Sequence, residues 1–171
     1  MNNTKNMIYT ALFAALTAVG AFLRIPMGYS SVTLQYLFTA MAGLLLGRKW
    51  GALSQLLYVL LGLVGLPIFT MGGGLGYVFQ PTFGFLLGLI PAAWVVGAIS
   101  AQRFDDPKRM ALAALAGLAV LYAIGLPYMG GILNLYMHKG MTVRAILWSG
   151  MIPYLPGDAL KILVAAGVCP V

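Results

Sequence analysis

The sequence predicts an all-α integral membrane protein with six transmembrane helices in one compact bundle. Of its 171 residues, 61% are hydrophobic and only 8% are charged, and the mean hydropathy is +0.95. A soluble domain carries about 25% charged residues, so this chain lacks the polar surface that water requires. A spanning helix with its connection uses roughly 25–30 residues. The length therefore allows about six spans in a single membrane domain, residues 1–171.

Six apolar runs give the expected helices, each bounded by charged residues, glycine or proline. The first covers residues 7–23. It is long, lacks a clear small-residue cleavage site and is followed by further spans, so we expect a membrane helix rather than a signal peptide. The other spans are expected at 34–47, 51–67, 83–100, 110–128 and from about 155 to the C-terminus. We expect a plain loop at 102–109, and at 129–152 a loop with a short interfacial or buried helix.

The basic residues indicate orientation rather than nucleic-acid binding, although the formal net charge is +7. They stand singly or in pairs at the ends of apolar runs, as is typical of membrane topology. With the N-terminus inside, the inner loops hold six of them and the outer loops three. This asymmetry predicts an N-in, C-in arrangement. The inner set is Lys5, Arg48, Lys49, Arg103, Lys108 and Arg109, and the outer set is Arg24, Lys139 and Arg144.

Asp158 and Lys161 are rare charges at the start of the last span, three residues apart, so a helix places them on one face. Inside a membrane such groups face the interior, pair with each other, or meet a polar ligand. One interpretation is a structural ion pair, with Gly157 or Asp158 as the helix N-cap. We favour a binding site, because the pair offers an acceptor and a donor on the face that also carries a glycine-rich loop.

That glycine-rich loop reads "TMGGGLGYVFQPTFG" at residues 70–84 and carries no charge. A flexible connector is one interpretation. However, linkers are usually rich in serine or charge, and irregular backbone at membrane depth is tolerated where it lines a cavity. The loop lacks the Gly-Lys-Ser/Thr end of a phosphate loop, as does the rest of the chain, so we expect no ATPase activity. His138 has no metal-ligand neighbours in the sequence, and we assign no metal.

Aromatic and small residues show two further patterns. Most aromatics near the outer ends suit an interfacial belt, and a few of them suit stacking on a ring-shaped ligand. The belt candidates are Tyr29, Tyr36, Tyr77, Phe79, Phe83, Tyr136 and Tyr154. Small residues spaced by four allow close helix approach. We expect the glycine pairs to pack helices together inside the bundle. For the alanine pairs of the first helix, packing inside the bundle and contact with another protein are both open. The pairs are Gly43–Gly47, Gly84–Gly88, Ala11–Ala15 and Ala14–Ala18.

Four segments make the chain resemble the BioY family, the biotin-specific S components of energy-coupling factor (ECF) transporters. They are "TLQ" at 33–35, "LLLGRKWGALSQLLYVLLGLVGLPIF" at 44–69, "GGGLGYVFQPTFGF" at 72–85 and "LPGDALK" at 155–161. The resemblance covers nearly the whole chain. The family often shows Gly-Pro-Ser/Thr-Gly-Gly-Tyr where this chain reads "QPTFGF". Gln80 and Phe83 here replace glycine, and Phe85 replaces tyrosine.

The resemblance implies an S-component fold in a multi-pass protein of a prokaryotic cell membrane, which takes up biotin from outside. It implies three partner subunits, a transmembrane coupling protein and two ATPases, so that ATP is used only by partners and this chain is neither an enzyme nor in need of a cofactor. The coupling protein is implied to dock on the first helix. The docking residues would be Ala11, Ala14, Ala15 and Ala18.

The resemblance also implies that Asp158 and Lys161 contact biotin. Biotin has a ureido group with two N–H donors and one carbonyl, an apolar ring and a carboxylate. Asp158 suits a ureido N–H, and Lys161 suits either the ureido carbonyl or the carboxylate. Further contacts are expected from loop amides, polar side chains and rings: Gly73, Gly74, Gly76, Thr33, Gln35, Gln80, Thr82, Phe79 and Tyr154.

Two alternatives to this function stay open. One is that the same fold binds a different vitamin. The other is that the chain acts as a stand-alone biotin transporter or channel, or as a membrane enzyme. A channel needs a continuous polar stripe, whereas the polar residues here concentrate at the outer ends. A membrane enzyme needs a second catalytic group near Asp158, and only Lys161 qualifies.

Overall fold

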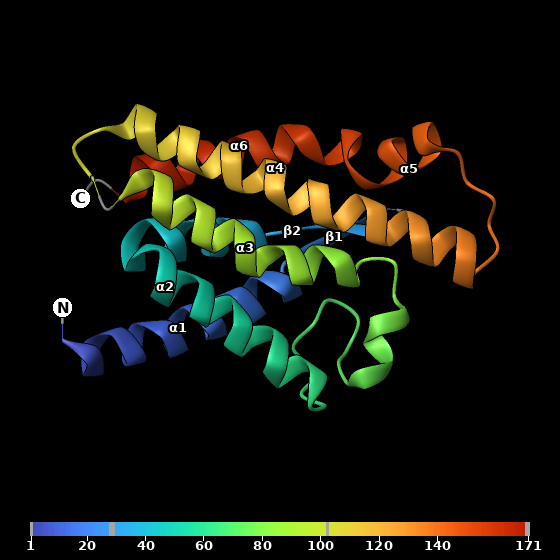
Figure 1. Cartoon of the computed structure of the whole chain (residues 1–171), viewed down its shortest axis with the longest axis horizontal. Coiled ribbons are helices and arrows are strands. Elements are labelled where there is room, and N and C mark those ends of the chain that lie inside the picture. Colours follow the sequence, from blue (N-terminus) through green and yellow to red (C-terminus); the bar gives the residue numbers. More distant parts are fainter. Residues whose placement is uncertain (1, 28–29, 102, 170–171) are drawn as a thin grey trace.

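The computed structural model describes residues 2–27, 30–101 and 103–169. Figure 1 shows a mainly helical molecule in which α1 begins and α6 ends at the same end. The α-helices are α1 (Asn3–Phe22), α2 (Gln35–Leu63), α3 (Phe83–Ser100), α4 (Pro107–Gly131), α5 (Val143–Gly150) and α6 (Leu155–Val168). Single helical turns are η1 (Leu75–Phe79), η2 (Ile132–Tyr136) and η3 (Ile152–Tyr154). The strands are β1 (Arg24–Met27) and β2 (Ser30–Thr33).

The helix boundaries confirm most of the expected runs and correct two details. The prediction of an all-α protein is incomplete, because β1 and β2 pair antiparallel with Arg24 opposite Thr33. The loop expected at 102–109 ends early, since α4 begins at Pro107. Asp106 caps this helix by accepting from the backbone N–H of Arg109 at 3.1 Å, and proline is favoured in the first helical turn. The short helix expected within 129–152 is present as α5.

Helix α2 contains two of the expected spans, folded back on each other at Gly47. Gly47 has φ 81° and ψ −178°, which breaks the helical conformation. Thr39 in the first half donates to the side-chain oxygen of Gln55 in the second half at 2.9 Å. Along one straight helix these residues would be about 24 Å apart, so the halves lie antiparallel. The predicted split between 34–47 and 51–67 is confirmed, although the second half ends at Leu63.

A buried polar network joins α1 to both halves of α2. The Gln55 side-chain amide donates to the Thr17 hydroxyl at 3.2 Å and to the Ser54 hydroxyl at 3.1 Å. Its carbonyl oxygen accepts from Thr39. All four side chains are fully buried. Buried polar groups are stable when they are hydrogen-bonded, so Gln55 holds the hairpin and α1 together.

Replacing Gln55 with leucine should lower the free energy of unfolding by about 1–3 kcal/mol, because the three hydroxyls lose a buried partner. The unfolding midpoint of the purified protein in detergent measures this effect. Without Gln55, the Thr17 and Thr39 hydroxyls retain only the backbone carbonyls of Phe13 and Gln35 as partners. Replacing both threonines with valine in the same protein removes these hydroxyls and should restore part of the loss. A triple variant as unstable as Gln55→Leu would contradict this explanation.

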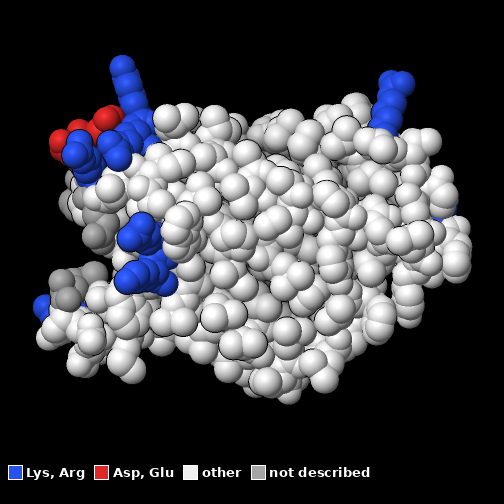
Figure 2. All heavy atoms as spheres, in the orientation of Figure 1, with Lys and Arg blue, Asp and Glu red and all other residues white. Residues whose placement is uncertain are grey.

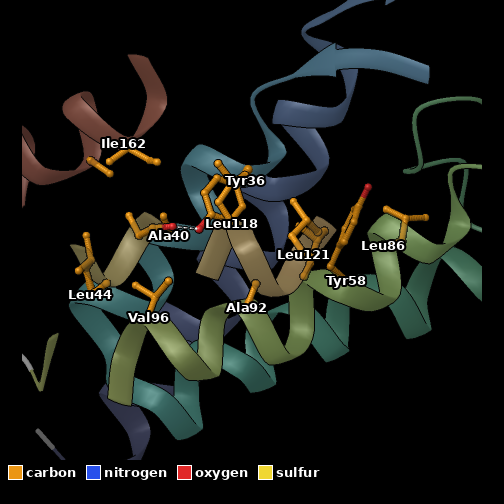
Figure 3. Close-up of a cluster of buried hydrophobic side chains, with 14 of the residues drawn as sticks. Tyr36, Ala40, Leu44, Tyr58, Leu86, Ala92, Val96, Leu118, Leu121 and Ile162 are labelled. Atoms are coloured by element: carbon orange, nitrogen blue, oxygen red, sulfur yellow. Dashed lines mark hydrogen bonds between the residues drawn. The ribbon is translucent and has the colours of Figure 1, made fainter. Parts of the chain in front are cut away.

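The core lies where α2, α3 and α4 meet, and backbone segments approach closely there. A methyl group at Gly43 would stand 2.6 Å from the carbonyl oxygen of Ala93, and one at Gly84 would stand 2.3 Å from Cβ of Tyr128. The packing role predicted for these glycines and Gly88 is confirmed, while Gly47 instead forms the bend. Figure 3 shows apolar side chains from three helices around this core: Tyr36, Ala40, Leu44, Leu86, Ala92, Val96, Leu118 and Leu121.

Four segments of the described chain are long and apolar enough to cross a membrane. They are Asn3–Phe22, Phe83–Ser100, Pro107–Tyr136 and Val143–Val168. The two halves of α2 are each shorter. Figure 2 shows most of the visible Lys and Arg at the end where α1 begins and α3 connects to α4, and a body without visible charged side chains between that end and the other. The chain is therefore a helical membrane protein with its charges at the ends.

Candidate functional site

The ion pair predicted from the sequence is present and buried. Lys161 Nζ lies 3.1 Å from Asp158 Oδ1, and the two residues are 8% and 4% exposed. Both belong to the first two turns of α6, where the positive end of the helix favours a carboxylate. The N-cap prediction is wrong, because Tyr154 is the N-cap and Pro156 and Gly157 already lie in the helix. A buried pair is costly unless it is well hydrogen-bonded.

Tyr122 of α4 is the third member of this group, and the sequence analysis did not identify it. Its hydroxyl donates to Asp158 Oδ2, so each carboxylate oxygen has a donor. Its ring meets the edge of Phe85 from α3, with centroids 6.0 Å apart and an interplanar angle of 86°. A polar group in the middle of the apolar run at 110–128 was the available signal. Helices α4 and α6 thus each supply a donor to Asp158, and α3 contacts the Tyr122 ring.

The predicted polar residues Thr33 and Gln35 form a second group at the start of α2. The Thr33 hydroxyl donates to the side-chain oxygen of Gln35 at 3.1 Å, and the Gln35 amide donates to the Tyr58 hydroxyl at 2.8 Å. Tyr58 in turn donates to the carbonyl oxygen of Ile68 at 2.9 Å. This chain of bonds connects β2, both halves of α2 and the segment that leads into the glycine loop.

Tyr36 brings the two groups near each other. It follows Gln35 in the sequence and is buried. Its hydroxyl donates to the carbonyl oxygen of Ala114 on α4. Helix α2 also contacts α6 directly, and Ile162 of α6, labelled with Tyr36 in Figure 3, belongs to the same cluster of buried hydrophobic side chains. The Gln35 group and the Asp158 group therefore flank the same junction of α2, α4 and α6.

The glycine loop is packed on the end of α2 and is not a loose connector. The backbone N–H of Gly74 donates to the carbonyl oxygen of Gly62 at 2.7 Å, so the prediction that this amide serves a ligand is wrong for this structure. A methyl group at Gly73 would lie 2.1 Å from the carbonyl oxygen of Leu66. Gly74 has φ 96°, which favours glycine. Gly76 has no atom within 4 Å of a built Cβ, so packing does not explain it.

The aromatic residues divide into a buried and an exposed set. Tyr36, Tyr77, Phe83 and Tyr154 are buried, so the interfacial-belt prediction is wrong for them. Phe79 and Tyr136 are more than half exposed and stack on each other, with ring centroids 4.9 Å apart. Phe79 therefore lies at the surface rather than in the core. Tyr29 is outside the described residues.

The remaining predicted site residues lie at the loop and on α1. Gln80 and Thr82 are half-buried between η1 and α3. On α1, Ala11 and Ala15 are exposed, Ala18 is half-buried, and Ala14 is 4% exposed within the core. Ala14 is thus unavailable to a partner in this structure.

Comparison with known proteins places this arrangement in a family. A model of the BioY family matches residues 1–171. The probable biotin transporter BioY of Lysinibacillus sphaericus is 40% identical over 166 residues, which are 96% of this chain and 84% of that protein. The biotin transporter BioY of Thermotoga maritima is 36% identical over 163 residues, which are 95% of this chain and 92% of that protein.

A solved structure shares the fold. The crystal structure of the S-component for biotin from an ECF-type ABC transporter aligns with a TM-score of 0.84, covering 99% of this chain and 93% of that chain. At 23% sequence identity this likeness shows a common fold, which confirms the S-component fold predicted from the sequence. Together with the match along the whole sequence, it leads to one assignment: this chain belongs to the BioY family.

Proposed function

We propose that this chain is the biotin-binding subunit of an ECF-type transporter. The observation that carries the proposal is the buried Asp158–Lys161 pair within a BioY family chain. Relatives that match almost the whole chain are named biotin transporters. Asp158 offers a carboxylate to a ureido N–H, and Lys161 offers donors to the ureido carbonyl or to the carboxylate of biotin. The chain itself is a transport subunit, with no cofactor and no reaction of its own.

Binding in a buried, polar group explains how such a site selects biotin. When biotin binds, its N–H and carbonyl groups exchange hydrogen bonds to water for hydrogen bonds to buried polar groups of the protein. An analogue without the ureido group would leave those protein groups unpaired. An unpaired buried group costs about 1–3 kcal/mol. The Gln35–Tyr58 group lies at the start of α2, next to Tyr36, which bonds to α4, and is proposed to supply a second set of polar atoms. Gln80, Thr82 and Gly76 then contribute from the loop.

The proposed topology has six membrane crossings with both termini inside. The two halves of α2 cross as a short antiparallel hairpin, because the Thr39–Gln55 bond pairs them side by side. Helices α1, α3, α4 and α6 supply the other four crossings. An even number of crossings agrees with the start of α1 and the end of α6 at one end of the molecule (Figure 1). The basic cluster at that end favours its placement in the cytoplasm.

Equilibrium binding to the purified protein tests the substrate. Isothermal titration with biotin, and with a panel of other water-soluble vitamins, should give submillimolar affinity for biotin alone. Desthiobiotin, which keeps the ureido group, should bind more tightly than an analogue without it. Biotin binding no tighter than millimolar, together with tight binding of another vitamin, would assign the fold to a different substrate.

Uptake into proteoliposomes separates the subunit from a stand-alone transporter. The protein alone should bind biotin without accumulating it, and the complex with a coupling protein and two ATPases should accumulate it when ATP is supplied. Accumulation by the chain alone would support the stand-alone alternative.

The exposed alanine face of α1 is the proposed docking surface for the coupling protein. Replacing Ala15 with leucine should spare biotin affinity and prevent co-purification with the coupling protein, because the added side chain projects from the exposed face. Small residues allow two helices to approach closely in a membrane. Ala14→Leu is the contrasting variant, since Ala14 is buried in the core and its enlargement should lower the unfolding midpoint. Normal assembly of the Ala15→Leu protein would place docking elsewhere.

A further inference from the structure

We propose that Tyr122 is a positioning residue, which holds the Asp158 carboxylate in the orientation that a ligand N–H group meets. This inference rests on the proposed function, in which Asp158 accepts from biotin. It concerns a residue that neither the sequence motifs nor the family match assigns. Its evidence is the geometry around the carboxylate.

The carboxylate is held from two different helices. Lys161, on the same helix α6, donates to Oδ1 at 3.1 Å. Tyr122, on α4, donates to Oδ2. The terminal torsion of an aspartate has no sharp minimum. Because the lysine side chain on the same helix is flexible, it can follow a rotation of the carboxylate and does not fix its orientation. A donor fixed on a neighbouring helix removes that freedom. Each carboxylate oxygen accepts more than one bond, so Asp158 keeps acceptor capacity for a ligand.

Tyr122 is itself braced. Phe85 from α3 contacts its ring edge-on. Phe85 occupies the space beside Gly125, where a built Cβ would stand 2.3 Å from Cδ1 of the phenylalanine ring. Gly125 therefore admits Phe85, and Phe85 limits how the Tyr122 ring can tilt. The orientation of the Asp158 carboxylate is thus set by α3 and α4 as well as by its own helix.

A double-mutant cycle tests whether Tyr122 acts through Asp158. Tyr122→Phe removes only the hydroxyl and should weaken biotin binding roughly tenfold, as expected for a hydrogen bond to a charged group. In an Asp158→Asn protein the charge is gone, and the same substitution should cost less than about twofold. Isothermal titration into the detergent-purified proteins, extended to millimolar biotin, gives all four affinities.

Tyr128→Phe is the matched control. Tyr128 lies on the same helix, and its hydroxyl donates to the backbone carbonyl of Val78 rather than to Asp158. Tyr128→Phe should change biotin affinity by the same factor in the wild-type protein and in the Asp158→Asn protein, whatever the size of that factor. Equal affinities for the wild-type and Tyr122→Phe proteins would overturn the inference. The same fold-loss from Tyr122→Phe in both backgrounds would also overturn it, because Tyr122 would then act without Asp158.

Two further measurements test the role of Tyr122 if one of these variants does not bind biotin or does not fold. If the Asp158→Asn protein has no measurable affinity, the solved structure of Tyr122→Phe decides: a rotated Asp158 carboxylate supports the inference, and an unmoved one refutes it. If Tyr122→Phe does not fold, Phe85→Leu loosens the brace and should weaken binding roughly threefold, with unchanged affinity counting against the inference. Wild-type protein that does not bind biotin would overturn the proposed function itself, which separates the two failures.

Discussion

Replacing Asp158 with leucine and Lys161 with methionine together should leave a folded protein whose affinity for biotin is at least about tenfold weaker. The two charged groups are buried and bonded to each other at 3.1 Å. Replacing a buried ion pair by apolar groups of similar volume is often neutral or stabilising, by about 1–4 kcal/mol. The fold therefore tolerates the double change, while the acceptor and the donor proposed for biotin are both lost.

The single variants behave differently from the double variant. Asp158→Ala leaves the Lys161 ammonium and the Tyr122 hydroxyl without their partner, and breaking a buried pair in this way costs about 3–5 kcal/mol of stability. Lys161→Ala leaves the carboxylate with Tyr122 alone. Both single variants should therefore lower the unfolding midpoint and weaken biotin binding. The double variant should recover most of the midpoint, because only the Tyr122 hydroxyl still lacks its partner, and it should not recover the affinity.

This comparison distinguishes a binding pair from a purely structural one. The unfolding midpoint and the titrated biotin affinity are measured on the same four purified proteins. A double variant that regains its midpoint and also keeps wild-type affinity would show that the pair only supports the fold. Loss of affinity with a recovered midpoint supports the binding site.

Replacing Gly97 with alanine should lower the unfolding midpoint markedly, because the helices touch through their backbones there. A Cβ at this position would stand 2.3 Å from the backbone nitrogen of Arg48 and 2.5 Å from the carbonyl carbon of Gly47. Real Cβ atoms do not approach backbone atoms so closely, so α3 and the bend in α2 would have to separate. Overpacking of this kind costs about 1–3 kcal/mol and occasionally more.

Gly167→Ala is the matched control for Gly97→Ala. Gly167 is also a helical glycine, in α6, and a Cβ there meets no atom within 4 Å. Its replacement should leave the midpoint unchanged or slightly raised, since alanine favours a helix. Thermal unfolding of the two variants in the same detergent makes the comparison. Equal midpoints would show that α2 and α3 can separate at the bend without cost.

The sequence was most informative where a residue type has few possible meanings. Asp158 and Lys161 are rare charges in an apolar chain, and helical spacing alone placed them on one face. The bend in α2 was also predictable, because "GRKWG" interrupts two apolar runs. Ionisable residues in a membrane segment are expensive, so their presence demanded a partner or a ligand.

The sequence was less informative where meaning depends on a distant neighbour. Tyr122 places one hydroxyl in an apolar run, but the partner of that hydroxyl is Asp158, which is 36 residues away and is not identified by the local sequence. Gln55 and Thr39 likewise acquire a function only once α2 folds back on itself. The alanines of α1 show the same limit: their spacing is regular, yet the structure buries Ala14 and exposes Ala15.

The glycine loop shows how one residue type can serve different purposes. Its glycines suggested amides free for a ligand, but Gly73 is required by close packing against Leu66 and Gly74 by its positive φ. The backbone bond from Gly74 to Gly62 uses the expected donor. Composition identifies such a loop as unusual, whereas the reason for each glycine is visible only in three dimensions.

The position of biotin in a solved structure of the purified protein tests the central claim most directly. The ureido group should lie within hydrogen-bond distance, about 2.7–3.2 Å, of the Asp158 carboxylate, with Lys161 bonded to a biotin oxygen. Biotin bound elsewhere, with the Asp158–Lys161–Tyr122 group untouched by the ligand, would contradict it.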